Sequence, residues 1–124
     1  MKALVIVEDD LDIQFLIETI FSMDSRFTVA GSAVSAEAAL ELARATEPEL
    51  IVLDHGLAGT LSGIDAVEQF RAVAPNAKII VFTAHAEVRA RVDQMIDVDA
   101  FLLKDEPGRL LPVAQQLTNM LSLI

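Results

Sequence analysis

The chain has 124 residues, of which 53% are hydrophobic and 23% charged, a composition that fits one folded domain and excludes a disordered chain. It contains no cysteine, which excludes disulfides, zinc fingers and cysteine nucleophiles. Nine basic and nineteen acidic residues give a formal net charge of −10, which argues against direct binding to nucleic acid or to anionic lipid.

All apolar runs of the sequence are short. Runs such as 3–7 and 50–53 fall far below the roughly 20 residues that span a bilayer. The first run continues into Glu8, Asp9 and Asp10 rather than into a cleavage site. We therefore expect a cytoplasmic protein that does not enter the membrane, with residues 1–124 forming a single domain.

Five short runs rich in Val, Ile, Leu or Phe predict β-strands. They cover residues 3–7, 27–30, 50–53, 78–82 and 100–103. None of them alternates between apolar and polar residues, which is typical of strands that are covered on both faces. The runs therefore predict a sheet with helices on each side.

Apolar residues at helical spacing follow each of these runs. The apolar positions are Ile13, Leu16, Ile17 and Ile20 in the first helix; Ala36, Ala39, Leu40 and Ala43 in the second; Ile64, Val67 and Phe70 in the third; Val88, Val92, Met95 and Ile96 in the fourth; and Leu110, Val113, Leu117, Met120 or Leu121, and Ile124 in the fifth. Ser35 is a candidate N-cap for the second helix. Pro112 places the start of the fifth helix near Arg109, because proline is tolerated only in a first turn.

Strands that alternate with helices predict a parallel sheet joined by right-handed crossovers. We expect an α/β fold with one flavodoxin-like, doubly wound, five-stranded sheet in the order 2-1-3-4-5, flanked by five helices. In such a sheet the functional groups gather beyond the carboxyl ends of the strands.

Polar residues stand at these ends. Glu8, Asp9 and Asp10 follow the first strand, Asp54 the third, Thr83 the fourth and Lys104 the fifth. The four strands are neighbours in the expected order, so their terminal side chains would share one edge of the sheet. Carboxylates that lie close together must take up protons or hold a cation. Oxygen donors without His or Cys favour Mg²⁺, and a metal beside an aspartate and a lysine is suited to phosphoryl transfer.

Each of these residues also has a plain structural interpretation. The acidic run can be a solvated helix start, and Asp54 can open a turn. Thr83 can end a strand, and Lys104 can be a surface charge. The occurrence of all of them at the ends of four adjacent strands favours a shared function.

The motifs LVIVEDD, IVLD, VFTAH and FLLKD resemble the receiver domain, the CheY-like phosphoacceptor module of two-component response regulators, along the whole chain. The LLKD ending and the run AVSAEAALELARATEPELIVLD are most similar to LuxR- or NarL-type receivers, which precede a helix-turn-helix output domain. The resemblance implies a phosphorylation-dependent signalling switch, and not an enzyme beyond its own phosphotransfer and autodephosphorylation.

The resemblance also implies a role for each site residue. Asp54 would accept a phosphoryl group from a sensor histidine kinase or a phosphotransfer protein. Mg²⁺, or Mn²⁺, would be held by Asp9, Asp54, the backbone oxygen of Gly56 and, through water, Glu8. Lys104 would pair with the phosphoryl group.

On the same resemblance, Thr83 would hydrogen-bond a phosphoryl oxygen, and the ring of Phe101, which replaces the common Tyr, would turn inward. The surface of the fourth helix, fifth strand and fifth helix would then control an output domain, a downstream protein or a second copy of the chain. We also expect two modulators, His85 through the water that hydrolyses the acyl phosphate, and Asp10. The alternative for His85 is an ordinary solvated side chain.

The loop after Asp54 departs from the family pattern. Receivers commonly have Pro four residues and Gly eight residues after the phosphorylated Asp, whereas this chain has Ala58 in the first place and Gly63 one residue late. We expect the loop of residues 56–63 to be more mobile than usual, because no proline restricts it.

Two other classes are disfavoured by single positions. A haloacid-dehalogenase-type phosphatase needs a second Asp where Gly56 stands, and a nucleotide-binding domain needs a glycine-rich turn where the chain has acids. A receiver-like scaffold that binds partners without phosphorylation is the remaining alternative. Residues 8–25 carry six acids and no base, Asp12 and Glu18 among them, which predicts docking of a partner helix pair.

Overall fold

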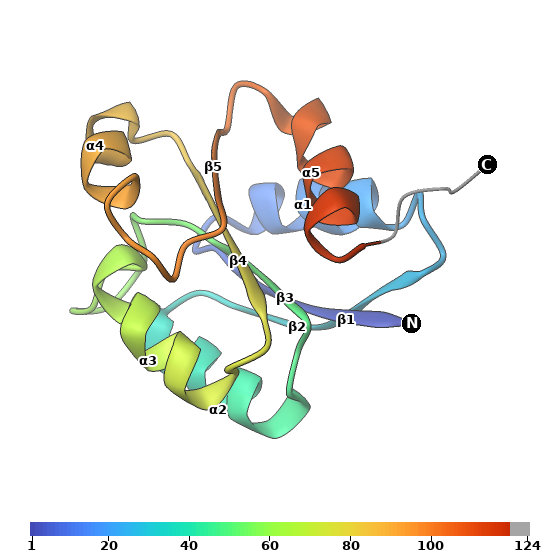
Figure 1. Ribbon diagram of the computed structural model, residues 1–124, viewed down its shortest axis with the longest axis horizontal. Coiled ribbons are helices and arrows are strands. Elements are labelled where there is room, and N and C mark those ends of the chain that lie inside the picture. The colour runs from blue at the N-terminus through green and yellow to red at the C-terminus, as the bar shows by residue number, and fades with distance from the viewer. Residues whose placement is uncertain (120–124) are drawn as a thin grey trace.

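The computed structural model describes residues 1–119 and shows five parallel strands in one sheet, in the order β2-β1-β3-β4-β5 (Figure 1). The strands are β1 (Lys2–Val7), β2 (Phe27–Ala33), β3 (Leu50–Leu53), β4 (Lys78–Thr83) and β5 (Ala100–Leu103). The predicted fold class and strand order are confirmed. Strand β2 is longer than predicted, because it pairs with β1 as far as the match of Val7 with Ala33.

Helices cover both faces of the sheet. They are α1 (Leu11–Phe21), α2 (Ala36–Thr46), α3 (Val67–Val73), α4 (Arg89–Val92) and α5 (Leu110–Leu117). Short 3₁₀ turns, η1 (Ile64–Ala66), η2 (Ala86–Val88) and η3 (Pro107–Arg109), precede the last three helices. Figure 1 shows α1 and α5 on one side of the sheet and α2 and α3 on the other. Within residues 1–119, no helix combines the length and the apolar character needed to cross a bilayer.

The starts of the helices follow local signals. The Ser35 hydroxyl accepts a hydrogen bond from the Ala38 amide at 3.2 Å, so Ser35 is the N-cap of α2 as predicted. Asp10 caps α1 in the same way, through the Asp12 amide at 2.9 Å. Pro112 is the third residue of α5, where its missing N–H costs no helical hydrogen bond.

The two faces of the sheet carry different cores. Strand β1 sends Leu4 and Ile6 to the side of α1 and α5, and Val5 and Val7 to the side of α2 and α3. Large side chains fill the first core, among them Phe21, Phe27 and Phe82. Small side chains dominate the second core, including Ala33, Ala36, Ala39, Ala43, Ala66, Ala74 and Ala77.

The fourth helix is shorter than predicted, and the assignment of Ile96 to its buried stripe is wrong. Helix α4 ends at Val92, which is buried, whereas Met95 lies between turns and Ile96 is 94% exposed. The Arg71 side chain of α3 donates a hydrogen bond to the Asp97 carbonyl at 2.9 Å and holds the chain in turns before β5. The chain leaves the helical path earlier, because the amides of Gln94 and Met95 donate to the carbonyls of Arg91 and Val92 in tight turns instead of continuing α4.

The fifth helix matches its prediction as far as Leu117, where α5 ends. The remaining predicted positions, Met120 or Leu121, and Ile124, lie outside the described residues.

Candidate functional site

The register of the sheet brings the ends of four strands to one edge. Val7 of β1 pairs with Leu53 of β3, so the residues that follow these strands stand at the same level. On the neighbouring pair, Thr83 of β4 is matched with Leu103 of β5. Residues from positions 8, 54, 83 and 104 therefore converge although the chain separates them widely.

Three carboxylates and one ammonium group meet at this edge. Ligand oxygens of Glu8, Asp9 and Asp54 all lie within 4.8 Å of one another. The Lys104 Nζ atom is 2.8 Å from Asp54 Oδ2 and 2.6 Å from Glu8 Oε1. Glu8 and Asp54 are buried, at 1% and 4% exposure, whereas Asp9 is open to solvent. One lysine thus serves two buried acids.

One ammonium group faces several carboxylates in this cluster, and burial makes the excess negative charge unfavourable. It raises the pKa of Glu8 from 4.5 to about 7, even though Lys104 and the Asp10 amide donate hydrogen bonds to the carboxylate. Burial also opposes the charge of Lys104, but hydrogen bonds to Asp54 and Glu8 outweigh it and raise the lysine pKa. The lysine therefore stays protonated, while Glu8 holds its negative charge at a cost in free energy.

The donor set fits a hard divalent cation. The three side chains supply only oxygens, and two of them are buried beside an exposed third that leaves access from solvent. Such a cluster suits Mg²⁺ or Mn²⁺, which prefer carboxylate oxygens and keep several water ligands. A cation there would also remove the unfavourable charge of Glu8.

Asp10 takes a structural place. Its carboxylate accepts hydrogen bonds from Asp12 and Ile13 at the start of α1, and its amide donates to Glu8 Oε2 at 3.1 Å. Its side chain is not one of the three that form the oxygen cluster. The plain interpretation of this acid as a helix start matches its geometry.

Thr83 ends β4, the strand next to β3, and Phe101 lies on β5, the strand after that. Thr83 is fully buried, and its hydroxyl accepts a hydrogen bond from the His85 amide at 3.2 Å. The ring of Phe101 is half-buried, with the Arg89 guanidinium carbon 5.4 Å from its centroid. The hydroxyl thus begins the loop that connects β4 with α4, and the ring lies against that helix.

The loop after Asp54 folds back onto the site. A Cβ atom at Gly63 would stand 1.8 Å from the Asp54 carbonyl oxygen, so only glycine fits this position. The Gly63 amide donates to the His55 carbonyl at 3.1 Å, and the Ala58 amide donates to Val34 at 3.3 Å. The late glycine noted in the sequence is therefore the residue that closes the loop.

The two histidines make a contact that the sequence does not reveal. The rings of His55 and His85 meet edge to face with centroids 5.4 Å apart. His85 Nε2 lies 2.9 Å from the place that a Cβ atom would occupy on Gly56, and its other nitrogen is 3.1 Å from Glu87 Oε2. Thirty positions separate the histidines, and no local periodicity links them.

Comparisons with known proteins show the family of the chain. The family model of the response regulator receiver domain matches residues 4–115. Over 115 residues the chain is 29% identical to the nitrate/nitrite response regulator NarL of Escherichia coli strain K12, covering 91% of this chain and 53% of that protein. It is 28% identical over 121 residues to the chemotaxis protein CheY of Thermotoga maritima, covering 95% and 98% of the two chains. The chain therefore spans about half the length of NarL.

Solved structures share the fold. A CheY-like receiver domain protein from Methanospirillum hungatei superposes with a TM-score of 0.85 at 23% identity, covering 97% of this chain and 95% of the other. A LuxR-family DNA-binding response regulator from Staphylococcus aureus gives 0.84 at 20% identity, covering 96% and 100%. The family model includes the strand ends that carry Glu8, Asp54 and Lys104, and the chain belongs to the response regulator receiver domain family.

Proposed function

We propose that this domain is a phosphorylation-dependent switch in which Asp54 accepts a phosphoryl group from a sensor histidine kinase or a phosphotransfer protein. Membership of the receiver family makes the domain a regulatory module of two-component signalling. The observation that carries the finer proposal is the buried Asp54 carboxylate, paired at 2.8 Å with Lys104 and next to two further acids. That arrangement combines a nucleophile with the groups that neutralise a transferred phosphate.

The transfer is a displacement at phosphorus. A carboxylate oxygen of Asp54 forms the new O–P bond while the P–N bond of the phosphohistidine breaks, and the electron pair of that bond returns to the imidazole nitrogen. Lys104 is close enough to both acids to pair with a phosphoryl oxygen as the negative charge moves. A Mg²⁺ or Mn²⁺ ion held by Asp9, Asp54, the Gly56 carbonyl and, through water, Glu8 would supply further charge neutralisation. Hydrolysis of the O–P bond later releases phosphate and restores the carboxylate.

The signal leaves the site through Thr83. Within residues 1–119 the Thr83 hydroxyl accepts a hydrogen bond from the His85 amide and donates to no partner, so its hydrogen can turn to a phosphoryl oxygen. A shift of the domain from almost entirely inactive to almost entirely active needs about 5.5 kcal/mol of difference in binding free energy between the two states. Two or three charge-assisted hydrogen bonds to the phosphoryl group can supply it. Inward movement of Thr83 would draw in the Phe101 ring and reshape the surface of α4, β5 and α5.

An exposed apolar pair supports docking of the phosphodonor on α1. Leu11 and Phe15 are 68% and 70% exposed and stand one helical turn apart beside the acidic edge. With Asp12 and Glu18 they offer an apolar centre with an acidic border, which suits a pair of partner helices. Charge reversal at Asp12 should slow transfer from the partner protein while labelling by a small phosphodonor continues. Unchanged transfer from the protein donor would contradict this docking site.

The output of the switch lies on another surface. We propose that α4, β5 and α5 act on an output domain, on a downstream protein or on a second copy of the chain, without direct contact of this domain with nucleic acid or membrane. Residues 1–124 form the receiver unit of this proposal, in the cytoplasm.

One labelling experiment tests the central proposal. The chain is incubated with Mg²⁺ and acetyl phosphate, and its intact mass is measured with and without EDTA. We expect a gain of one phosphoryl group that disappears in Asp54→Asn and with EDTA, but persists in the matched control Asp12→Asn, an exposed acid on α1. Absence of labelling in the folded wild-type chain would favour the phosphorylation-independent scaffold.

A further inference from the structure

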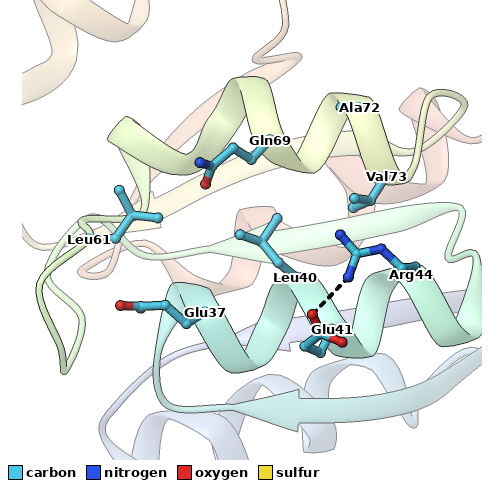
Figure 2. A pocket seen from close by; sticks show the side chains of 8 residues that line it. All are labelled: Glu37, Leu40, Glu41, Arg44, Leu61, Gln69, Ala72 and Val73. Atoms are coloured by element: carbon cyan, nitrogen blue, oxygen red, sulfur yellow. Dashed lines mark hydrogen bonds and ion pairs between the residues drawn. The ribbon is translucent and has the colours of Figure 1, made fainter.

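A groove runs between α2 and α3, with a volume of about 480 Å³ (Figure 2). The apolar part of the groove is formed by Leu40 of α2, Leu61 of the loop between β3 and η1, and Val73 of α3. All three are half-buried against the core on this face. Figure 2 shows Leu40 and Leu61 pointing toward the space between the helices. The volume lies within the range of roughly 300–1,000 Å³ that is typical of ligand sites.

Small side chains keep this space open. The wall formed by α3 carries Ala72, whose single methyl group leaves room that a longer side chain would fill. The inner face of α2 is likewise alanine-rich, with Ala36, Ala39 and Ala43 packed tightly on the sheet. The groove is therefore a feature of the packed helix pair, and its apolar lining stays accessible from outside.

Charge decides what this groove attracts. Glu37 stands at one end, exposed, and takes part in no ion pair within residues 1–119. The Thr60 hydroxyl donates a hydrogen bond to its carboxylate at 3.4 Å. Along the same wall, the Arg44 guanidinium is already paired with Glu41 at 2.7 Å. The border therefore presents one uncompensated carboxylate on a chain of net charge −10, which disfavours anionic ligands.

We propose that the groove between α2 and α3 binds a segment of a partner protein that carries an aliphatic or aromatic side chain flanked by Lys or Arg. The apolar side chain would cover Leu40, Leu61 and Val73, and the basic group would pair with Glu37. A second copy of the chain is a poorer occupant, because two domains with ten excess negative charges each repel one another.

This docking surface is separate from the proposed phosphodonor surface and reaches the phosphorylation site by a different route. Helix α1 lies on the other side of the sheet (Figure 1). Leu61, however, belongs to the loop that joins Asp54 to η1 and that closes through Gly63 on the Asp54 carbonyl. A bound segment would thus restrain that loop, and this link does not depend on transfer of phosphate to Asp54.

Peptide selection tests the proposal on the full chain. Random short peptides displayed on phage are selected on the immobilised wild-type protein, and the most enriched peptide is synthesised and titrated by fluorescence anisotropy. We expect an enriched pattern of an apolar residue next to Lys or Arg. Ala72→Trp fills the groove and should lower the affinity for this peptide by at least about tenfold, because the apolar side chain of the peptide can no longer enter. Glu37→Gln should lower the affinity for the peptide by about threefold, which is the contribution expected from one exposed ion pair.

Matched variants separate the groove from general surface effects. Ala45→Trp places the same ring on an exposed position of α2 outside the groove, and Glu68→Gln removes an exposed charge of α3 outside it. Both should bind the peptide like the wild type. Three outcomes would overturn the proposal: no enrichment, peptides that bind Ala72→Trp unchanged, or a wild-type dimer in sedimentation that Ala72→Trp abolishes.

Discussion

Buried acids lie at both ends of the sheet, and their surroundings differ. Asp24, which precedes β2, receives hydrogen bonds from the Arg26 amide at 3.0 Å, the Arg26 guanidinium at 2.7 and 2.9 Å, and Gln115 of α5 at 3.0 Å. These hydrogen bonds hold the pKa of Asp24 well below its usual value. At the opposite end, Glu8 and Asp54 share a single lysine, and burial raises the pKa of Glu8 to about 7.

The difference separates an acid whose charge is fully compensated from acids whose charge is not. Asp24 has enough donors to hold its charge permanently, so it fastens α5 to the segment before β2. The cluster at Glu8, Asp9 and Asp54 has fewer donors than its charge requires, and it gains most from a cation or a phosphoryl group with its counterions. Unmet charge is therefore the physical property that distinguishes the second end of the sheet and supports the proposal that it is the reactive one.

The largest expected effect is that of Lys104→Met, which leaves two buried acids without their cation. Without metal, we expect the free energy of unfolding to fall by about 3 kcal/mol at about pH 8, measured by urea denaturation. The loss should shrink near about pH 6, because Glu8 then takes up a proton and the buried charge disappears.

The sign of this pH dependence follows from the raised pKa. In the wild type Glu8 binds its proton more tightly when folded than when unfolded, so its ionisation weakens the fold as the pH rises from 4.5 through about 7. In Lys104→Met the free energy of unfolding should fall more steeply as the pH rises. A variant that is equally destabilised at both pH values would show that Glu8 does not carry the unmet charge.

The second effect is stabilisation of the wild type by Mg²⁺. At about a hundred times its dissociation constant a ligand adds about 2.7 kcal/mol, which is visible as a higher Tm. The gain should be larger at about pH 8 than at about pH 6, because protons compete for Glu8 below its pKa. Asp9→Asn should reduce the gain, and Asp12→Asn, an exposed acid outside the cluster, should keep it.

A smaller effect is expected at the opposite end. Asp24→Ala removes the acceptor of Arg26 and Gln115 and should lower the Tm at neutral pH. Its lowered pKa means that the stabilisation is present above the ordinary value of 3.8 and fades as the pH falls through the folded-state value. The gap in Tm between variant and wild type should therefore narrow only below about pH 3.8, whereas the loss for Lys104→Met already shrinks near about pH 6. A gap that widens in acid would contradict the comparison.

The smallest effect is expected for His85→Ala. The His85 ring lies over Gly56 and against His55, so its loss opens the mouth of the site to water without touching the core. We expect a change of a few fold in the loss of phosphate from Asp54, followed by intact mass, and an unchanged Tm. Identical dephosphorylation rates would remove His85 from the list of modulators.

Local patterns in the sequence were sufficient for the architecture. Short runs rich in Val, Ile, Leu or Phe mark all five strands, and Ser35 and Pro112 place two helix starts, because these signals act over a few neighbouring residues. The strand-end acids and Lys104 could also be identified from the sequence, because parallel strands bring the residues at their carboxyl ends to one edge of the sheet. The resemblance to receivers assigned their roles, which the experiments above test.

Contacts between distant segments decided the rest. Arg71 contacts the Asp97 carbonyl in the turns before β5, the Asp54 carbonyl demands glycine at position 63, and the two histidines meet only after the loops have folded. The raised pKa of Glu8 and the groove beside Ala72 have the same origin, because burial and the space between helices are properties of packing. Residue order thus determined the elements and the edge where the acids gather, and the tertiary structure determined how those acids share charge and which surfaces stay open.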